Sequence, residues 1–213
     1  MRKHIFLFLL LLSICCKAQI KSLYDDEYGV ISGAYYKDIY NDFNRFEGSW
    51  ILENANSTLI SKLKKKEHLY INGLKETFYQ DILVGEYRYI DNGIEKINTL
   101  PNLLVEYEDP YFYNLAGDII NKPVSGVPEA CLNCGPNDVK VKLTFGEPNR
   151  EIFWYEPSML FHHFIENGVE KARVVFASGG NYAGSDSNSN GGFTNPYSTY
   201  TIPFGVYILT KQL

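Results

Sequence analysis

Two cysteines three positions apart, Cys131 and Cys134, are the residues best suited to chemistry in this sequence. Thiols at this spacing can form a disulfide, supply two of the four ligands of a structural zinc, or act as a redox pair. A zinc site needs two further ligands, and no histidine lies close to the pair in the sequence. A thioredoxin-like pair needs a strand and a helix around it, whereas this pair lies in a loop rich in Pro, Gly and Ser, residues 121–137. The disulfide is the simplest interpretation, and zinc and redox chemistry stay open.

Two adjacent histidines, His162 and His163, are the second candidate for chemistry. Neighbouring side chains on a strand point to opposite faces, so one strand cannot direct both rings at a single metal ion. We expect one ring on the solvent side and the other in a partly apolar layer. A catalytic role for either is the less favoured alternative.

Oxygen-bearing side chains also gather at Asp38, Asn41, Asp42 and Asn44. They could hold calcium, but they lack the spacing, the bend glycine and the terminal acid of an EF-hand, so we interpret them as a polar turn facing water. The sequence contains no Gly-x-Ser-x-Gly elbow, no His-Glu-x-x-His motif and no phosphate-binding loop. We therefore predict no catalytic residue, metal or cofactor, and favour a protein that is not an enzyme.

Residues 1–18 indicate the compartment. A basic start is followed by an apolar run over residues 5–12 and by small or polar residues ending at Ala18, which is the layout of a secretory signal peptide. The run is shorter than the roughly 20 residues of a membrane-spanning helix. We expect cleavage after Ala18 and export to the periplasm or the medium; the alternative is a lipoprotein anchored through Cys15 or Cys16. Export favours the oxidised cysteine pair.

The charge balance points away from polyanionic partners. The chain has 20 basic and 25 acidic residues, a net charge of −5, and removal of the leader with its three basic and no acidic residues makes it −8. Nucleic acids and anionic lipids require a basic patch, so we expect neither as the main partner. After the leader, no apolar run is long enough to cross a membrane.

The elements that must position these residues are mainly strands. Apolar residues at three- and four-residue spacing between Tyr36 and Phe46 predict one short helix. Seventeen Tyr and 13 Phe among 213 residues, with alternating segments afterwards, predict about nine strands. We predict strands over residues 49–53, 58–66, 78–90, 94–99, 139–145 and 151–155, a hairpin over 159–177, and a last strand over 199–210. The fold class is all-β, an antiparallel up-and-down barrel or sandwich.

Two Asn-Gly pairs, at Asn92 and at Asn167, predict tight hairpins, because a type I′ turn requires positive φ at both central residues. A two-residue loop then sets the cross-strand partners. These predicted pairs are Ile90 with Glu95, Tyr89 with Lys96, Ile165 with Glu170, and Phe164 with Lys171. The domain organisation that we expect is a signal peptide (1–18), an irregular lead-in with the helix (19–46) and one β domain (47–213). That domain contains a flexible loop rich in Gly, Ser and Asn (179–198).

Several short sequence segments together resemble those of one family of small exported bacterial proteins, domain of unknown function 6705. They are Gly-Ala-Tyr-Tyr-Lys-Asp (33–38), Phe-Glu-Gly-Ser-Trp (46–50), Gly-Glu-Tyr-Arg-Tyr (85–89) running on to Asn-Thr-Leu (98–100), the cysteine pair with Pro136, and Pro-Phe-Gly-Val-Tyr (203–207). The resemblance covers nearly all of the chain after the leader. It implies that Cys131 and Cys134 belong to the design of the domain, and it transfers no activity.

A looser resemblance is to lipocalin-like barrels, which also begin with a helical turn and a Gly-x-Trp, here Gly48 and Trp50. In that fold the Trp closes one end of the barrel beneath a basic residue late in the chain, a position that Lys211 would fill. The resemblance implies a barrel-closing role for these three residues. It does not establish function.

Three functions compete at this stage. The aromatic content and the predicted barrel favour binding of a small apolar ligand at the barrel mouth. The alternative is a structural or protein-interaction module of the cell envelope, and an unrecognised enzyme ranks third. The sequence leaves the ligand, the partner and the oligomeric state open.

Overall fold

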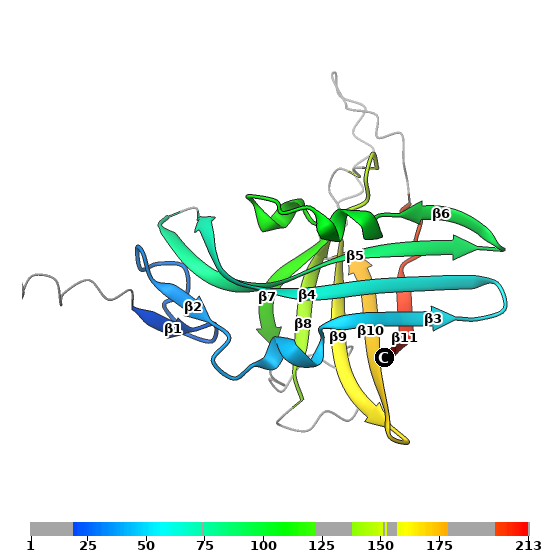
Figure 1. Ribbon diagram of the computed structural model, residues 1–213, viewed down its shortest axis with the longest axis horizontal. Coiled ribbons are helices and arrows are strands. Elements are labelled where there is room, and N and C mark those ends of the chain that lie inside the picture. Colours follow the sequence, from blue (N-terminus) through cyan, green and yellow to red (C-terminus); the bar gives the residue numbers. More distant parts are fainter. Residues whose placement is uncertain are drawn as a thin grey trace, which may run out of the picture.

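The computed structural model describes residues 19–73, 75–121, 138–150, 152, 157–178 and 199–212. These residues form eleven strands and three short 3-10 turns (Figure 1). The strands are β1 (Ile20–Ser22), β2 (Tyr35–Lys37), β3 (Gly48–Glu53), β4 (Ser57–Asn72), β5 (Thr77–Asp91), β6 (Ile94–Asn98), β7 (Leu115–Asn121), β8 (Lys140–Phe145), β9 (Pro157–Glu166), β10 (Val169–Ser178) and β11 (Gly205–Gln212). The turns are η1 (Asp42–Arg45), η2 (Leu100–Leu104) and η3 (Pro110–Phe112).

Eight of these strands close into an antiparallel barrel. Around the barrel they follow the order of the chain, β3-β4-β5-β7-β8-β9-β10-β11. Two pairings close the ring, β5 with β7 at Gly85 and Leu115, and β11 with β3 at Lys211 and Trp50. The predicted all-β antiparallel class is confirmed, and between barrel and sandwich the structure is the barrel. Strands β1, β2 and β7 were not predicted.

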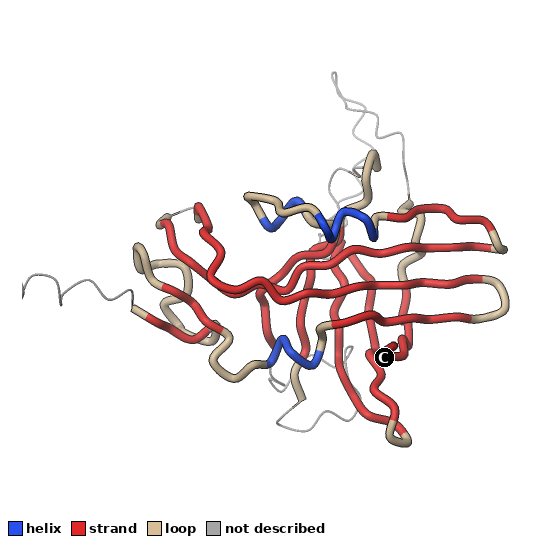
Figure 2. Tube along the Cα trace, viewed as in Figure 1, coloured by secondary structure: helices blue, strands red, loops and turns tan. Residues whose placement is uncertain are grey.

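Strand β5 pairs with three strands along one edge, because it extends beyond the part that belongs to the barrel wall. Along the edge away from β4 it pairs with β2 near Tyr79, with β7 between Leu83 and Gly85, and with β6 near its end. Strands β1 and β2 run parallel to their partners and extend the sheet beyond one end of the barrel. The tube view shows this extension beside the barrel and β6 on its far side (Figure 2).

Both predicted hairpins are present. The two central residues of each turn have positive φ, 50° and 75° at Asn92 and Gly93 and 53° and 77° at Asn167 and Gly168. Three of the four predicted cross-strand pairs are confirmed: Ile90 with Glu95, Ile165 with Glu170, and Phe164 with Lys171. The fourth is wrong, because the register shifts between Tyr89 and Ile90, so that Tyr89 faces Ile97.

The predicted helix between Tyr36 and Phe46 is wrong. Its start is strand β2 and its end is the single turn η1, and the described parts of the chain contain no α-helix. The apolar residues do not share one buried stripe, since Ile39 and Tyr40 are exposed while Tyr36, Phe43 and Phe46 are buried. Asn41, just before η1, has φ 56°, a left-handed conformation that interrupts any helix. No helix in the described residues has the length and apolar character needed to cross a bilayer.

Large side chains fill the inside of the barrel. Inward positions alternate along each strand, as Leu59 and Leu63 do on β4. Rings from different strands are in contact: the centroid of Phe145 lies 5.0 Å from that of Tyr87 and 4.5 Å from that of Phe176. The expected strand at 151–155 (Ile152 excepted) and the expected loop 179–198 lie outside the described residues.

Candidate functional site

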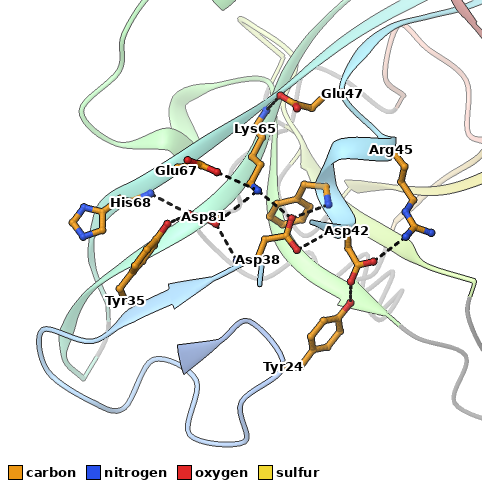
Figure 3. Close-up of polar contacts among 11 residues, drawn as sticks. Tyr24, Tyr35, Asp38, Asp42, Arg45, Glu47, Lys65, Glu67, His68 and Asp81 are labelled. Atoms are coloured by element: carbon orange, nitrogen blue, oxygen red, sulfur yellow. Dashed lines mark hydrogen bonds and ion pairs between the residues drawn. The ribbon is translucent and has the colours of Figure 1, made fainter. Parts of the chain in front are cut away.

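The densest polar cluster of the described structure surrounds Lys65 at one end of the barrel (Figure 3). Lys65 continues the inward series of β4 after Leu63, so its stem enters the barrel end. Its ammonium nitrogen lies 3.3 Å from Asp38 Oδ2, 4.0 Å from Asp81 Oδ2 and 3.3 Å from the exposed carboxylate of Glu67. The side chains of Asp38 and Asp81 are fully buried, and that of Lys65 nearly so. One cation therefore holds two buried carboxylates.

Each buried carboxylate also accepts hydrogen bonds from other elements. Asp38 accepts the backbone N–H groups of Asp42 (2.8 Å) and Phe43 (3.0 Å), which fixes the start of η1. Asp81 accepts the N–H groups of Asp38 (3.0 Å) and His68 (3.1 Å). It also accepts the Tyr35 hydroxyl at 2.5 Å. The cluster thus joins β2, β4, β5 and η1.

A second set of contacts fastens the segment before β3 to this end. Asp42 accepts the Tyr24 hydroxyl at 2.6 Å and pairs with Arg45 at 3.1 Å. Glu47 Oε1 accepts the backbone N–H of Lys65 at 2.8 Å. Through these contacts the chain from β1 to η1 is held across the barrel end (Figure 3).

The protonation states of Lys65 and Tyr35 favour a structural role for the cluster over a catalytic one. Burial opposes the charge on Lys65, but the carboxylates around it outweigh that effect and raise its pKa. Burial, assisted by the hydrogen bond to Asp81, also raises the pKa of Tyr35. At neutral pH the lysine is an ammonium and the tyrosine a neutral phenol, so neither is an activated nucleophile or base. This chemistry positions segments of the chain.

Tyr28 forms a second polar cluster, on the outside of the barrel. Its hydroxyl contacts both Gln80 Oε1 and Asp118 Oδ2, which joins the N-terminal segment to β5 and β7. Burial raises the pKa of Asp118, and it raises that of nearby Tyr111 to about 12. Gln80 Nε2 is buried and makes no hydrogen bond within the described parts of the chain.

The three residues predicted to close the barrel lie together. Trp50 is fully buried and its Nε1 donates to the Phe46 carbonyl at 2.7 Å. Lys211 Nζ lies 5.4 Å from the centroid of the Trp50 ring and 2.9 Å from Glu170 Oε2. A Cβ on Gly48 would lie 3.4 Å from Lys211 Cε. The barrel-closing role of these residues stays a prediction.

The paired histidines lie on opposite faces, but the expected solvent exposure is wrong. His163 faces the barrel end, where its ring centroid lies 6.1 Å from that of Trp50 and its Nε2 lies 3.1 Å from Glu170. His162 faces outward, yet it is buried, whereas His163 is partly buried. Burial lowers the pKa of both rings, so both are neutral at neutral pH.

The oxygen-bearing set is divided by the fold. Asp38 and Asp42 are buried in the Lys65 cluster, whereas Asn41 and Asn44 are exposed. Among the residues that the structure describes, no three acidic, histidine or cysteine side chains are placed to hold a metal ion. Cys131 and Cys134 lie outside the described residues, and their disulfide remains a prediction.

Sequence reasoning missed Lys65 and Asp81. The available signal was periodicity: Lys65 follows Leu59, Ser61 and Leu63 in the inward phase of one strand. A lysine in that phase requires buried counter-ions. Its partner in β5 could not be identified without the register.

Comparisons with known proteins identify a family but no individual relative. A family model with the description "Family of unknown function (DUF6705)" matches residues 1–212. Searches found no matching curated protein and no matching solved structure.

Proposed function

The chain belongs to the DUF6705 family of unknown function, and we propose that it is an exported protein-interaction module of the cell envelope that binds through the outside of its barrel. Export is supported by the signal-peptide layout of residues 1–18. The mass of the mature protein tests it: a chain that starts at Gln19 is expected, and an acylated Cys15 or Cys16 would indicate a lipoprotein. The same spectrum, with and without reductant, tests the proposed disulfide through a difference of about 2 Da.

One observation carries the interaction function: apolar side chains are buried inside the barrel, and the two most exposed large apolar side chains of the described residues lie on one outer segment. Trp50, Tyr87, Phe161 and Phe176 are fully buried and occupy the interior. In contrast, Leu104 is 88% exposed and Phe112 is 68% exposed. Clustered exposed apolar side chains are typical of interaction surfaces.

These exposed side chains belong to residues 104–112, which we call the acidic loop. The segment that contains it packs on the outer face of β5, where Tyr113 contacts Ile82 and Val84. The loop also holds Glu108, Asp109 and Glu106, of which Glu106 pairs with Lys66 of β4. An apolar surface rimmed by carboxylates fits a partner that presents apolar and basic groups.

Site-specific photocrosslinking tests this function. The variant Leu104→benzoylphenylalanine is expected to form an adduct with a partner protein in envelope preparations. The same substitution at Ala55, which is exposed in the β3–β4 hairpin, is expected to form none. Phe112→Ser should reduce the Leu104 adduct. Equal labelling from the two positions would contradict binding through the acidic loop.

A small apolar ligand inside the barrel is the second candidate, and one observation favours it. Ser61 lies in the inward phase of β4, and its hydroxyl is buried without a hydrogen-bond partner in the described residues. A polar group on a ligand could supply the hydrogen-bond partner that this hydroxyl lacks. Binding of a fluorescent fatty acid that is lost in Ser61→Leu and kept in the outward-facing variant Ile60→Leu would support this function; no saturable binding would contradict it.

A further inference from the structure

The Lys65 cluster holds an amine and a carboxyl group from different elements in direct contact. Lys65 belongs to β4, whereas Asp38 lies between β2 and η1. The distance from Lys65 Nζ to Asp38 Oδ2, an oxygen bonded to Cγ, is 3.3 Å. The side chain of Asp38 is 0% exposed and that of Lys65 is 6% exposed (Figure 3). Two groups that can react with each other are therefore held together away from bulk water, which removes much of the entropic barrier to reaction.

We infer that Lys65 and Asp38 condense to an isopeptide bond between Lys65 Nζ and Asp38 Cγ. An ammonium and a carboxylate together contain the atoms of one amide and one water molecule, so the step needs no oxidant, reductant or other reactant. The N–C bond forms, one C–O bond of the carboxyl group breaks, and the oxygen leaves as water with two of the ammonium protons. The ion pair described above is the state before condensation. The reaction removes two buried charges, which are costly to keep out of water.

Asp81 is placed to carry the proton that this reaction must move, because an ammonium is not a nucleophile. Its Oδ2 lies 4.0 Å from Lys65 Nζ and accepts the backbone N–H of Asp38 at 3.0 Å, so Asp81 lies beside both reacting residues. Proton transfer from Nζ to Asp81 gives an amine and a carboxylic acid, a neutral pair that burial favours over the two charges. Asp81 then returns the proton to the oxygen that leaves as water.

Backbone N–H groups at the start of η1 stabilise the charge that develops on Asp38. The N–H of Asp42 donates to Asp38 Oδ1 at 2.8 Å, and that of Phe43 donates to Oδ2 at 3.0 Å. When Nζ adds to Cγ, negative charge grows on these two oxygens. Donors that already point at them lower the barrier, as in an oxyanion hole.

The cross-link fastens the chain before β3 to the end of the barrel by a covalent bond. It goes beyond the proposed interaction function and is independent of it, because no residue of the acidic loop takes part. Either one can therefore fail while the other holds.

Intact-mass spectrometry of the denatured and reduced full chain tests the inference. The wild type is expected to be lighter than its sequence requires by about 18 Da, the mass of one water. Lys65→Arg keeps the positive charge but forms no such amide, so this variant should show no water loss. Lys64→Arg, at the adjacent exposed position, should lose water as the wild type does. Comparison among these three proteins cancels any change at the N-terminus, which all of them share.

Two carboxylates near Nζ give a matched test of the proton carrier. Glu67 Oε1 lies 3.3 Å from Nζ but its side chain is 59% exposed, so water can replace it. Glu67→Gln should therefore keep the cross-link, and Asp81→Asn should prevent it. Far-UV circular dichroism first confirms that both variants are folded. A cross-link that forms equally in the two variants would overturn the role of Asp81.

A change at Asp38 identifies the acceptor carbon without removing it. Asp38→Asn is expected to condense with loss of ammonia, about 17 Da, instead of water. Tandem mass spectrometry of a tryptic digest should find the peptides of residues 38 and 65 joined in the wild type and in this variant. The inference is overturned if the wild type has its full mass and the two peptides are separate, or if Lys65 is joined to Asp81 instead of Asp38.

Discussion

Lys65 occupies a position where the alternation of β4 would normally place an apolar side chain. Burying an ammonium costs several kcal/mol unless it is paired and hydrogen-bonded. Here two buried carboxylates, Asp38 and Asp81, provide that pairing, and their remaining acceptor sites are filled by backbone N–H groups. The ion pairs of the cluster therefore add little net free energy to the stability of the fold. The loss of one partner is nevertheless costly, because it leaves a buried charge without a counter-ion.

Replacing Lys65 tests this interpretation. Lys65→Met keeps the apolar stem and removes the charge, and we expect it to lower the free energy of unfolding by about 3–5 kcal/mol. The raised pKa means that the ammonium stabilises the fold at neutral pH, and that this contribution is lost only as pH rises through the folded-state value. Urea unfolding at pH 7 measures the change.

The adjacent residue provides the control. Lys64 is exposed and faces outward, so Lys64→Met should change stability by no more than about 0.5 kcal/mol. Adding Asp38→Asn and Asp81→Asn to Lys65→Met should restore part of the loss, because no unmatched charge remains. Equal effects of the two lysine variants would contradict a buried charge cluster.

Asp118 also makes stability fall as pH rises, but it does so in the acidic range. Burial raises its folded-state pKa, so folding disfavours the carboxylate. Stability is therefore lost as pH rises from the unfolded-state pKa, about 3.9, through the raised folded value. Asp118→Asn cannot ionise, so we expect it to gain stability relative to the wild type across this window when urea unfolding is measured between pH 4 and pH 8. The control is Asp26→Asn, at an exposed position, whose free energy of unfolding should differ from that of the wild type by an amount that does not vary with pH. If the difference between Asp118→Asn and the wild type were also constant across pH, the prediction would be contradicted.

Strand β5 is the element on which the barrel closes, and Gly85 lies at the closure. It faces Leu63 of β4 on one side and Leu115 of β7 on the other. A Cβ at Gly85 would lie 2.4 Å from Leu63 Cδ2 and 2.7 Å from the Lys62 carbonyl oxygen. Only a residue without a side chain allows this approach of the strands.

Gly85→Ala is therefore expected to destabilise the protein by about 1–3 kcal/mol through overpacking. Gly205→Ala is the matched control, since a Cβ there meets no atom within 4 Å. Thermal unfolding of the two variants makes the comparison. If they melt at the same temperature, β4 and β7 do not approach each other closely at Gly85.

The elements that could be predicted from sequence are those that local residues determine. Asn92 and Asn167, each followed by Gly, specify their turns without reference to the rest of the chain. The turn η1 could not be predicted in this way, because its start is held by a carboxylate, Asp38, that is fixed by Lys65 of another strand. Apolar spacing alone predicted a helix there, and tertiary contacts decided otherwise.

The short strands β1, β2 and β7 escaped prediction for a related reason. Strands β1 and β2 are three residues each and exist through parallel pairing with distant segments. Strand β7 contains Gly117 and Asp118, residues that disfavour strands when judged alone. The candidate site depends on the same long-range register, so Lys65 could be suspected from its phase while its partners could not.

The whole molecule is stabilised by closure rather than by any one sheet face. Strand β11 pairs with β10 on one side and with β3 on the other, and it contributes buried Leu209 to the core. Removing it would open the barrel and expose the backbone edges of two strands. By contrast, residues 19–33 lie outside the ring of eight strands.

Two deletions separate these contributions. Deletion of residues 205–213 should abolish cooperative urea unfolding, because the core then lacks one wall and loses the pairing of β3 with the end of the chain. Deletion of residues 19–33 should leave a single cooperative transition at a lower urea concentration, since Tyr36 and Phe78 lose cover from Tyr28 while all eight barrel strands remain. Circular dichroism follows both transitions. If the first deletion still unfolds cooperatively, the stability of the molecule does not depend on closure, because seven strands then suffice to form the core.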